Sequence, residues 1–264
     1  MIDLDMLRLQ AAKTGLGIKY LSKEEQISIL LIQLHELFPD NVVLKGGTAL
    51  NRGYLQSQQK GRFSEDIDLD YILKQPLDTK ITRIKTIMQK LSEFIVSPPR
   101  IHHHTLRFDC QYTNQLDEKD RVQVEFYLDK KKPAVRPQTI LLQPQYIPAP
   151  GTLFKVYSLD DLLAQKLMAL YNRGEGKDIY DVFYVLDMPF KKNIVKNALS
   201  DLLIYHHIKL EYGNFLKDLI KKLDTLQSNA QYIGNSTNHF IPRSLRPDWV
   251  VFIRTLKEKI TQNL

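Results

Sequence analysis

The spacing of apolar residues changes along the chain. Residues 1–14 and 22–37 repeat apolar positions every three or four residues, which is the period of an α-helix. Residues 66–73 instead alternate polar and apolar side chains, as a strand with one buried face does. Residues 105–112 and 121–128 alternate in the same way and predict a β-hairpin. The first half of the chain therefore predicts helices followed by a sheet.

Two helix boundaries in this half are also predicted. Ser22 is a candidate N-cap, because a short hydroxyl side chain there precedes the acidic residues Glu24 and Glu25. A further helix is expected over residues 77–94, ahead of the helix-breaking pair Pro98-Pro99.

Helical spacing returns at Ser158. This residue and Asp161 resemble a capping box, so a helix is expected to run from there to about residue 172. The sequence Gly174-Glu175-Gly176 interrupts it, and a second helix is expected over residues 177–186. Beyond Pro189 the pattern stays helical, so the end of the chain predicts a helical domain.

The order of these elements predicts the fold class and its division. Residues 133–151 contain five prolines and predict an extended connection with one strand at residues 139–142. We expect an α/β (α+β) fold with an N-terminal α/β domain over residues 1–150 and a helical C-terminal domain over residues 151–264.

The basic residues are unevenly distributed. The formal net charge is +7, and residues 188–264 hold twelve Lys and Arg against six Asp and Glu. A basic excess favours a polyanionic partner through counterion release. A solvated basic helical surface without any partner is the alternative that charge alone leaves open.

Composition also bears on location. The single cysteine, Cys110, cannot form an internal disulfide. The first 15 residues contain early acids and no apolar run that ends in a cleavage site, unlike a signal peptide. The most apolar stretch, residues 27–34, is far shorter than the roughly 20 residues that span a bilayer. We expect a cytoplasmic protein without a membrane segment.

A glycine turn lies between a short apolar strand and a helix at Lys45-Gly46-Gly47-Thr48. Glycines let the backbone approach a ligand closely, and a helix start offers free N–H groups to a phosphate. Such a turn alone is weak evidence, because ordinary tight turns contain the same residues.

Asp66 and Asp68 strengthen this prediction. They are two apart on a strand, so both carboxylates face one side, and they repel each other unless a cation lies between them. Hard oxygen ligands in this arrangement suit Mg²⁺ that bridges substrate phosphates. Arg62 and Ser64 come just before them and are candidates for binding those phosphates. The region predicts a metal and phosphate site.

Two-metal phosphoryl chemistry needs a third acid nearby. Glu125 is the best candidate, because it lies on the polar face of the predicted strand 121–128. Asp109, on the preceding strand, is a weaker rival, and an exposed strand glutamate is the structural alternative.

Three separated motifs resemble one family in order and kind. They are LKGGTAL at residues 44–50, RFSEDIDLD at 62–70 and SLDDLLAQKLMALYNRGEGKDIYDVFYVL at 158–186. They resemble the AbiEii/AbiGii nucleotidyltransferase toxin family of the polymerase-β-like nucleotidyltransferase superfamily. The resemblance implies a polymerase-β-like core with a mixed sheet, followed by a helical domain that completes the active-site cleft. It also implies the toxin of a toxin–antitoxin or phage-defence (abortive infection) system, with a cognate antitoxin as a partner.

The resemblance assigns roles by position. Gly46, Gly47 and Thr48 match the family's phosphate-binding turn, Asp66 and Asp68 its metal ligands, and Lys166 and Asp178 the lysine and the acid of its later motif. Beside these positions, the candidate phosphate-binding residues are Lys45, Arg62, Ser64 and Arg173, and Glu125 is the candidate third metal ligand and catalytic acid. Glu125 is the least secure, because the family's residues around that acid differ from those here. Lys166 and Arg173 are seven apart and share a helical face, so they could bind a triphosphate or form a structural ion network with Asp178 or Asp181.

The expected reaction is in-line attack by a substrate hydroxyl on the α-phosphorus of an NTP, with two Mg²⁺ ions and release of pyrophosphate. The resemblance implies an RNA acceptor, with the 3′ end of tRNA as the first candidate. Two alternatives remain at this point. One is a nucleotidyltransferase that acts on a small molecule or a protein, and the other is a non-catalytic nucleotide-binding module.

Overall fold

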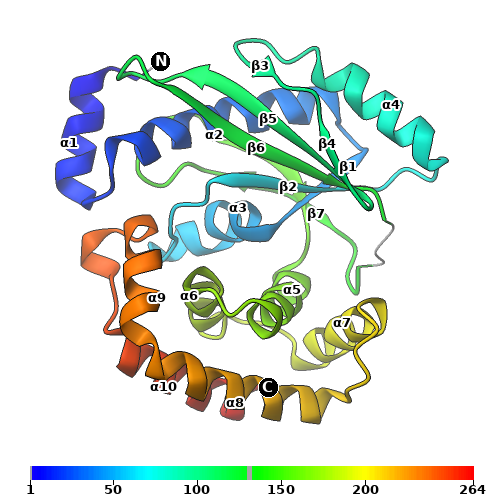
Figure 1. Ribbon diagram of the computed structural model, residues 1–264, viewed down its shortest axis with the longest axis vertical. Coiled ribbons are helices and arrows are strands. Elements are labelled where there is room, and N and C mark those ends of the chain that lie inside the picture. The colour runs from blue at the N-terminus through cyan, green and yellow to red at the C-terminus, as the bar shows by residue number, and fades with distance from the viewer. Residues whose placement is uncertain (1, 130–132) are drawn as a thin grey trace. The chain divides into compact units, whose positions relative to one another are not determined.

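The computed structural model describes residues 2–129 and 133–264 (Figure 1). The described residues form two compact units. The first, here the sheet unit, comprises residues up to 129 together with 137–156, and the second, the helical unit, comprises 133–136 together with 157–264. The prediction that residues 1–150 are catalytic and residues 151–264 complete the cleft stays a prediction.

The sheet unit contains an eight-stranded mixed sheet. Its strand order is β3-β5-β6-β2-β1-β8-β7, with β4 paired to β5. Pairs β2–β6 and β1–β8 are parallel and the others antiparallel. The strands are β1 (Val42–Lys45), β2 (Asp66–Tyr71), β3 (Ile95–Val96), β4 (Arg100–His102), β5 (Thr105–Thr113), β6 (Lys119–Tyr127), β7 (Gln138–Leu142) and β8 (Thr152–Val156). The predicted hairpin is confirmed as β5–β6, and the strand predicted at residues 139–142 as β7.

Helices of the sheet unit differ from prediction at two boundaries. They are α1 (Leu4–Thr14), α2 (Ile18–Leu37), α3 (Gly46–Leu50), a π-helical turn η1 (Asn51–Leu55), a 3₁₀ turn η2 (Gln56–Gln58) and α4 (Leu77–Met88). The N-cap prediction for Ser22 was wrong, because α2 begins earlier and the buried Ser22 hydroxyl donates to the Gln115 side chain. The helix predicted to reach residue 94 ends at Met88, and the chain then turns into β3.

Alternation along β2 and β6 gives the sheet one apolar and one polar face. Ile67 and Leu69 of β2 lie beside Val124 and Phe126 of β6, and all four are fully buried. The Phe126 ring lies 5.2 Å from that of Phe38, which follows α2. The apolar face therefore packs on α2, whose long ribbon runs along the sheet in Figure 1. The aspartates of β2 lie on the other face.

A buried polar network joins α2 to the turn after α3. The Arg52 guanidinium donates to the Ser28 hydroxyl and to the Glu24 backbone carbonyl, each at 2.8 Å. The Glu24 carboxylate lies 3.8 Å from that guanidinium and accepts from the Gln145 backbone N–H at 2.6 Å. Burial raises the pKa of Glu24, and the Arg52 charge opposes this. The network fixes the element that follows the glycine turn.

The helical unit follows the predicted pattern closely. Its helices are α5 (Leu159–Asn172), α6 (Gly176–Val185), α7 (Lys192–Tyr205), α8 (Tyr212–Ser228), α9 (Ala230–Thr237) and α10 (Trp249–Asn263), with 3₁₀ turns η3 (Asn238–Phe240) and η4 (Arg243–Leu245). The Ser158 hydroxyl accepts from the Asp161 backbone N–H at 3.1 Å, which confirms the predicted cap. Gly174 has φ +68°, so the predicted break is a left-handed turn. Within the described ranges, no helix has the length and apolar character needed to cross a bilayer.

We expect Arg52→Ala to lower the free energy of unfolding by about 3–5 kcal/mol, because it leaves the buried Glu24 carboxylate without its cation. Urea unfolding followed by circular dichroism measures this change. Arg8→Ala is the control, since Arg8 is paired on the surface of α1 and such pairs contribute about 0–1 kcal/mol. Equal losses in the two variants would contradict a stabilising role for the network.

Candidate active site

The site begins where β1 turns into α3. Gly46 has φ +70°, a backbone conformation that residues with a side chain rarely adopt. A methyl group on Gly46 would lie 3.1 Å from Asp68 Cγ and would overlap its Oδ2. The glycine therefore lets the backbone of the turn lie directly against a carboxylate of β2.

Gly47 lies against two of the predicted phosphate-binding residues. A methyl group there would be 2.6 Å from the Ser64 hydroxyl oxygen and 3.1 Å from Arg62 Nη2. Arg62 is buried and donates to the Phe63 carbonyl at 2.9 Å. The structure thus brings Gly47, Arg62 and Ser64 together from two separate segments, as a shared role in anion binding requires.

Asn51 is a site residue that the sequence analysis missed. Its fully buried side chain donates to the Gly47 carbonyl at 2.9 Å and accepts from the Arg62 backbone N–H at 2.7 Å. One amide therefore links the glycine turn to the segment that precedes β2. The only signal in the sequence was a polar residue four positions after Gly47, a spacing that brings a side chain near that carbonyl in a helix.

Thr48 is also fully buried. Its hydroxyl donates to the backbone carbonyl of Asp66, so α3 is tied to the first residue of β2. In this structure the Thr48 hydroxyl is used to connect two elements of the site. Its predicted contact with a phosphate stays a prediction.

The aspartates of β2 differ in their surroundings. Asp66 and Asp68 are half-buried, whereas Asp70 is buried and binds Lys45 at 2.5 Å. The Lys45 ammonium also lies 3.3 Å from the centre of the Tyr127 ring. Lys45, which was predicted to bind phosphate, is thus held beside Asp70.

Glu125 is the Cα partner of Asp68 across the parallel strands β2 and β6. Its carboxylate lies 2.5 Å from Arg107 and accepts from the Tyr127 hydroxyl at 3.0 Å. Burial and the nearby Asp68 and Glu125 carboxylates raise the pKa of Tyr127, so this hydroxyl stays protonated and donates. Arg107 and Tyr127 were not predicted.

Asp109 was the rival for the role of third acid. It lies 2.9 Å from Arg100 and 3.5 Å from Arg121, and it accepts from the Gln123 amide at 3.3 Å. Three donors therefore surround its carboxylate, whereas Glu125 is the residue directly beside Asp68. The geometry favours Glu125 over Asp109 as the partner of the two aspartates.

The donor set near β2 fits a hard cation in part. Asp66 and Asp68 supply carboxylate oxygens on one face, and the missing Cβ of Gly46 lets the Asp68 carboxylate lie directly against the turn. Among the residues that the structure describes, no three His, Cys, Asp or Glu side chains already converge as a metal site. The two aspartates fit Mg²⁺, and the carboxylate of Glu125, on the neighbouring strand, is paired with Arg107.

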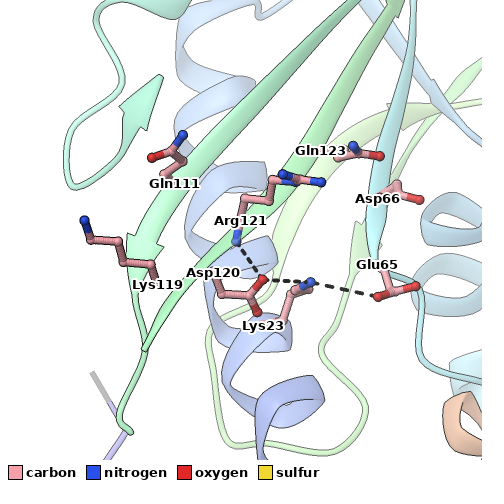
Figure 2. Close-up of a pocket in the computed structure, with 8 residues that line it drawn as sticks. All are labelled: Lys23, Glu65, Asp66, Gln111, Lys119, Asp120, Arg121 and Gln123. Carbon is pink, nitrogen blue, oxygen red and sulfur yellow. Dashed lines mark hydrogen bonds and ion pairs between the residues drawn. The ribbon is translucent and has the colours of Figure 1, made fainter. Parts of the chain in front are cut away.

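A polar pocket of about 440 Å³ opens beside Asp66 (Figure 2). It is lined by Lys23, Glu65, Asp66, Gln111, Lys119, Asp120, Arg121 and Gln123. Lys23 lies between two carboxylates, 3.2 Å from Asp120 and 3.9 Å from Glu65. Asp66 is thus shared by the predicted metal site and a cavity that the sequence did not reveal.

Lys166, Arg173 and Asp178 lie together in the helical unit. The Lys166 ammonium is 3.1 Å from Asp178 and 2.7 Å from Asp181, and both aspartates are fully buried. Arg173 binds Asp178 through two nitrogens, at 2.7 and 2.9 Å. Burial alone would raise the pKa of Asp178, but Lys166 and Arg173 outweigh it and lower this pKa to about 2. The structural ion network considered as an alternative from the sequence is therefore present. Binding of triphosphate by Lys166 and Arg173 stays a prediction.

Comparison with known proteins identifies a family. The model of the nucleotidyl transferase AbiEii toxin family, from type IV toxin–antitoxin systems, matches residues 29–262. No curated protein matches the chain.

Solved structures share the fold at low sequence identity. MenT4, a nucleotidyltransferase toxin from Mycobacterium tuberculosis, superposes with a TM-score of 0.64 at 16% identity, over 99% of this chain and 90% of that one. JHP933 from Helicobacter pylori superposes with a TM-score of 0.56 at 20% identity, over 94% of this chain and 95% of that one. Both superpositions cover nearly the whole chain. The chain therefore shares its fold, a mixed sheet followed by helices, with these two proteins.

We expect Gly46→Ala to cost about 1–2 kcal/mol of stability, because alanine is strained at positive φ, and to displace the Asp68 carboxylate. Nucleotide transfer should fall at least about ten-fold, since each 1.36 kcal/mol of lost transition-state stabilisation is a factor of ten. Gly213→Ala in α8 is the control, because nothing lies within 4 Å of the added methyl group. Unchanged transfer by Gly46→Ala would show that the close approach is dispensable.

The low pKa of Asp178 predicts a pH dependence of stability. The folded pKa of about 2 is below the ordinary value of 3.8, so the charged network stabilises the fold above pH 4. About 2 kcal/mol should be lost as the pH falls from 4 to 2. Unfolding free energies measured across this range should decline less steeply for Asp178→Asn than for the wild type. Asp5→Asn, at an exposed carboxylate, should follow the wild type, and identical slopes in all three proteins would refute this assignment.

Proposed function

The chain belongs to the AbiEii nucleotidyltransferase toxin family of type IV toxin–antitoxin systems, and on that premise we propose that it transfers a nucleotide from an NTP to the 3′ end of an RNA, with tRNA as the acceptor. The observation that carries this proposal is the contact between the Gly46 turn and Asp68. It brings the turn that we propose binds phosphate against the carboxylate pair, and phosphoryl transfer needs both kinds of group.

The reaction would form a bond between the RNA 3′ oxygen and the α-phosphorus of the NTP. The bond from that phosphorus to the bridging oxygen breaks, pyrophosphate leaves, and the proton of the attacking hydroxyl passes to solvent. The backbone of Gly46 and Gly47 would lie along the phosphates, where the absence of Cβ atoms allows close approach. Arg62 and Ser64, already against Gly47, would add donors to the phosphate oxygens.

Asp66 and Asp68 would hold Mg²⁺, and two ions are proposed. Bound Mg²⁺ would lower the pKa of the attacking hydroxyl and balance the charge of the leaving pyrophosphate. Glu125 is proposed as the third ligand, because it is the residue beside Asp68 on the neighbouring strand. Its carboxylate would exchange the Arg107 contact for the metal, and Arg107 would then be available to an anion.

Lys45, Thr48, Lys166, Arg173 and Asp178 are proposed from the family motifs. Lys45 is close to the carboxylates but is held by Asp70, so its role would be to balance their charge before substrate binds. Lys166 and Arg173 would bind triphosphate, with Asp178 fixing both cations in position. These roles rest on the motif and on the ion network in the helical unit.

RNA is proposed as the acceptor on electrostatic grounds. The net charge of +7 favours a polyanion, and most of the excess lies after Met188. Membership of a type IV toxin–antitoxin family also implies an antitoxin partner. The proposed setting is the cytoplasm, where NTPs and tRNA occur together.

We expect the wild-type protein, incubated with Mg²⁺, an α-labelled NTP and total tRNA, to label the RNA. Asp68→Asn should lower the rate by at least about 1,000-fold, because it removes a ligand charge of the metal site. Asp5→Asn is the matched control, since its carboxylate is exposed on α1. Testing each of the four NTPs separately would identify the donor.

The location of the label decides between acceptors. Label on a protein or a small molecule, with none on RNA, would contradict the RNA proposal and favour another acceptor for the same chemistry. Induction in cells gives an independent readout, because wild type should arrest growth and Asp68→Asn should not. Equal arrest by both would contradict toxicity through metal-dependent transfer.

A further inference from the structure

The pocket beside Asp66 lies on one side of β2, and the glycine turn lies on the other. In the sheet, β1 with its Gly46 turn flanks β2 on one edge, while β6 and then β5 follow on the opposite edge. Gln123 of the pocket is the Cα partner of Asp66 across the β2–β6 pair. We propose that this pocket binds the terminal nucleotide of the RNA acceptor, an inference that rests on the proposed function.

The direction of the reaction supports this assignment. In phosphoryl transfer the attacking and leaving oxygens lie roughly in line, on opposite sides of the phosphorus. The proposed phosphate contacts of Gly47, Arg62 and Ser64 place the leaving pyrophosphate on the β1 side of the aspartates. The attacking hydroxyl must then approach from the other side, which is where β6 and the pocket lie.

The pocket exists because β6 begins before its pairing with β2. β6 starts at Lys119, but the first pair with β2 joins Asp66 to Gln123. Beside this stretch, Lys23 of α2 lies between Asp120 and Glu65, as Figure 2 shows. Lys23 offsets one of these two negative charges, so its ammonium is held by carboxylates of the lining. The pocket's volume of about 440 Å³ is within the roughly 300–1,000 Å³ of small-ligand sites and is sufficient for one nucleotide.

The lining offers the donors that a polynucleotide end requires. Lys119 and Arg121 are exposed cations, and a guanidinium can bind two oxygens of one phosphate. Arg121 lies 3.5 Å from Asp109, so it would bind a phosphate with its remaining nitrogens. Gln111 and Gln123 present amides, which both donate to and accept from base edges and ribose hydroxyls. Along β6, Lys119 lies farthest from Asp66, Arg121 with its β5 partner Gln111 comes next, and Gln123 lies beside Asp66. A terminal nucleotide whose hydroxyl is at Asp66 would extend its phosphate toward the two cations. A neutral small acceptor has no phosphate to offer Lys119 or Arg121.

The test compares Lys119→Gln and Arg121→Gln with the control Arg8→Gln, which removes an exposed positive charge from α1. Binding of a fluorescent single-stranded RNA with a free 3′ hydroxyl is measured by anisotropy at salt concentrations from about 50 to about 200 mM. Over this range the affinity of a protein that contacts phosphates falls steeply with salt. Each pocket variant should raise the Kd about ten-fold, as expected for a lost hydrogen bond to a charged group. Each should also lower the slope of log affinity against log salt by about one.

Kinetics separate acceptor binding from donor binding. The KM for RNA should rise about ten-fold in both pocket variants, while the KM for the NTP stays within about two-fold of wild type. Thermal unfolding checks that the variants are folded, and if one variant unfolds the other carries the test, because both side chains are exposed.

The outcomes distinguish this inference from the proposed function. If wild type labels RNA and the pocket variants match Arg8→Gln in Kd and KM, the pocket assignment is wrong and the proposed function stands. If a pocket variant changes the KM for the NTP instead, the pocket binds the donor and the assignment is again wrong. If wild type neither labels nor binds RNA, or labels a protein, both are overturned.

Discussion

The close approach of the Gly46 backbone to the Asp68 carboxylate constrains everything around it. It requires a residue without a Cβ and with a positive φ, and it requires β1 and β2 to pair in the observed register. The buried side of the turn is held by two side chains. The Thr48 hydroxyl donates to the Asp66 carbonyl of β2, and the Asn51 amide donates to the Gly47 carbonyl of α3. This geometry places the turn proposed to bind phosphate directly against a carboxylate proposed to bind metal.

The polar face of the sheet is organised as alternating charges. Going outward from the centre of the sheet, Asp70 contacts Lys45, Glu125 contacts Arg107 and Asp109 contacts Arg100. Each carboxylate would otherwise be repelled by its neighbour across the strands. The cations offset the repulsion between the acids, and Arg107 is more exposed than the buried Lys45.

The sequence revealed the parts of this site that depend on local spacing. Alternation in residues 66–73 predicted that Asp66 and Asp68 share a face, and the Gly46-Gly47 pair predicted a tight strand–helix turn. The sequence could not reveal that Arg107 faces Glu125. That pairing depends on the register of β5 against β6, and turns of different lengths between the two strands would give different registers.

The same limit applied to the pocket and to α2. The pocket depends on β2 beginning part-way along β6, which no local pattern encodes. Ser22 was misassigned because a capping hydroxyl and a buried one look alike until a distant partner, here Gln115, is known. In the helical unit, by contrast, the cap at Ser158 and the break at Gly174 follow from residues adjacent in the chain, and both were predicted.

The parallel pairing of β2 with β6 has a consequence for when, during synthesis, the candidate site is complete. Parallel strands need a long crossover, and here α4 and three further strands intervene between the two. Contacts between distant segments form late, since the loop that joins them must first be ordered. A nascent chain on the ribosome that ends before Lys119 therefore contains the two aspartates and the glycine turn without the strand that carries Glu125. The two aspartates and the third candidate acid therefore come together only after the chain has been synthesised through β6 and the sheet has formed.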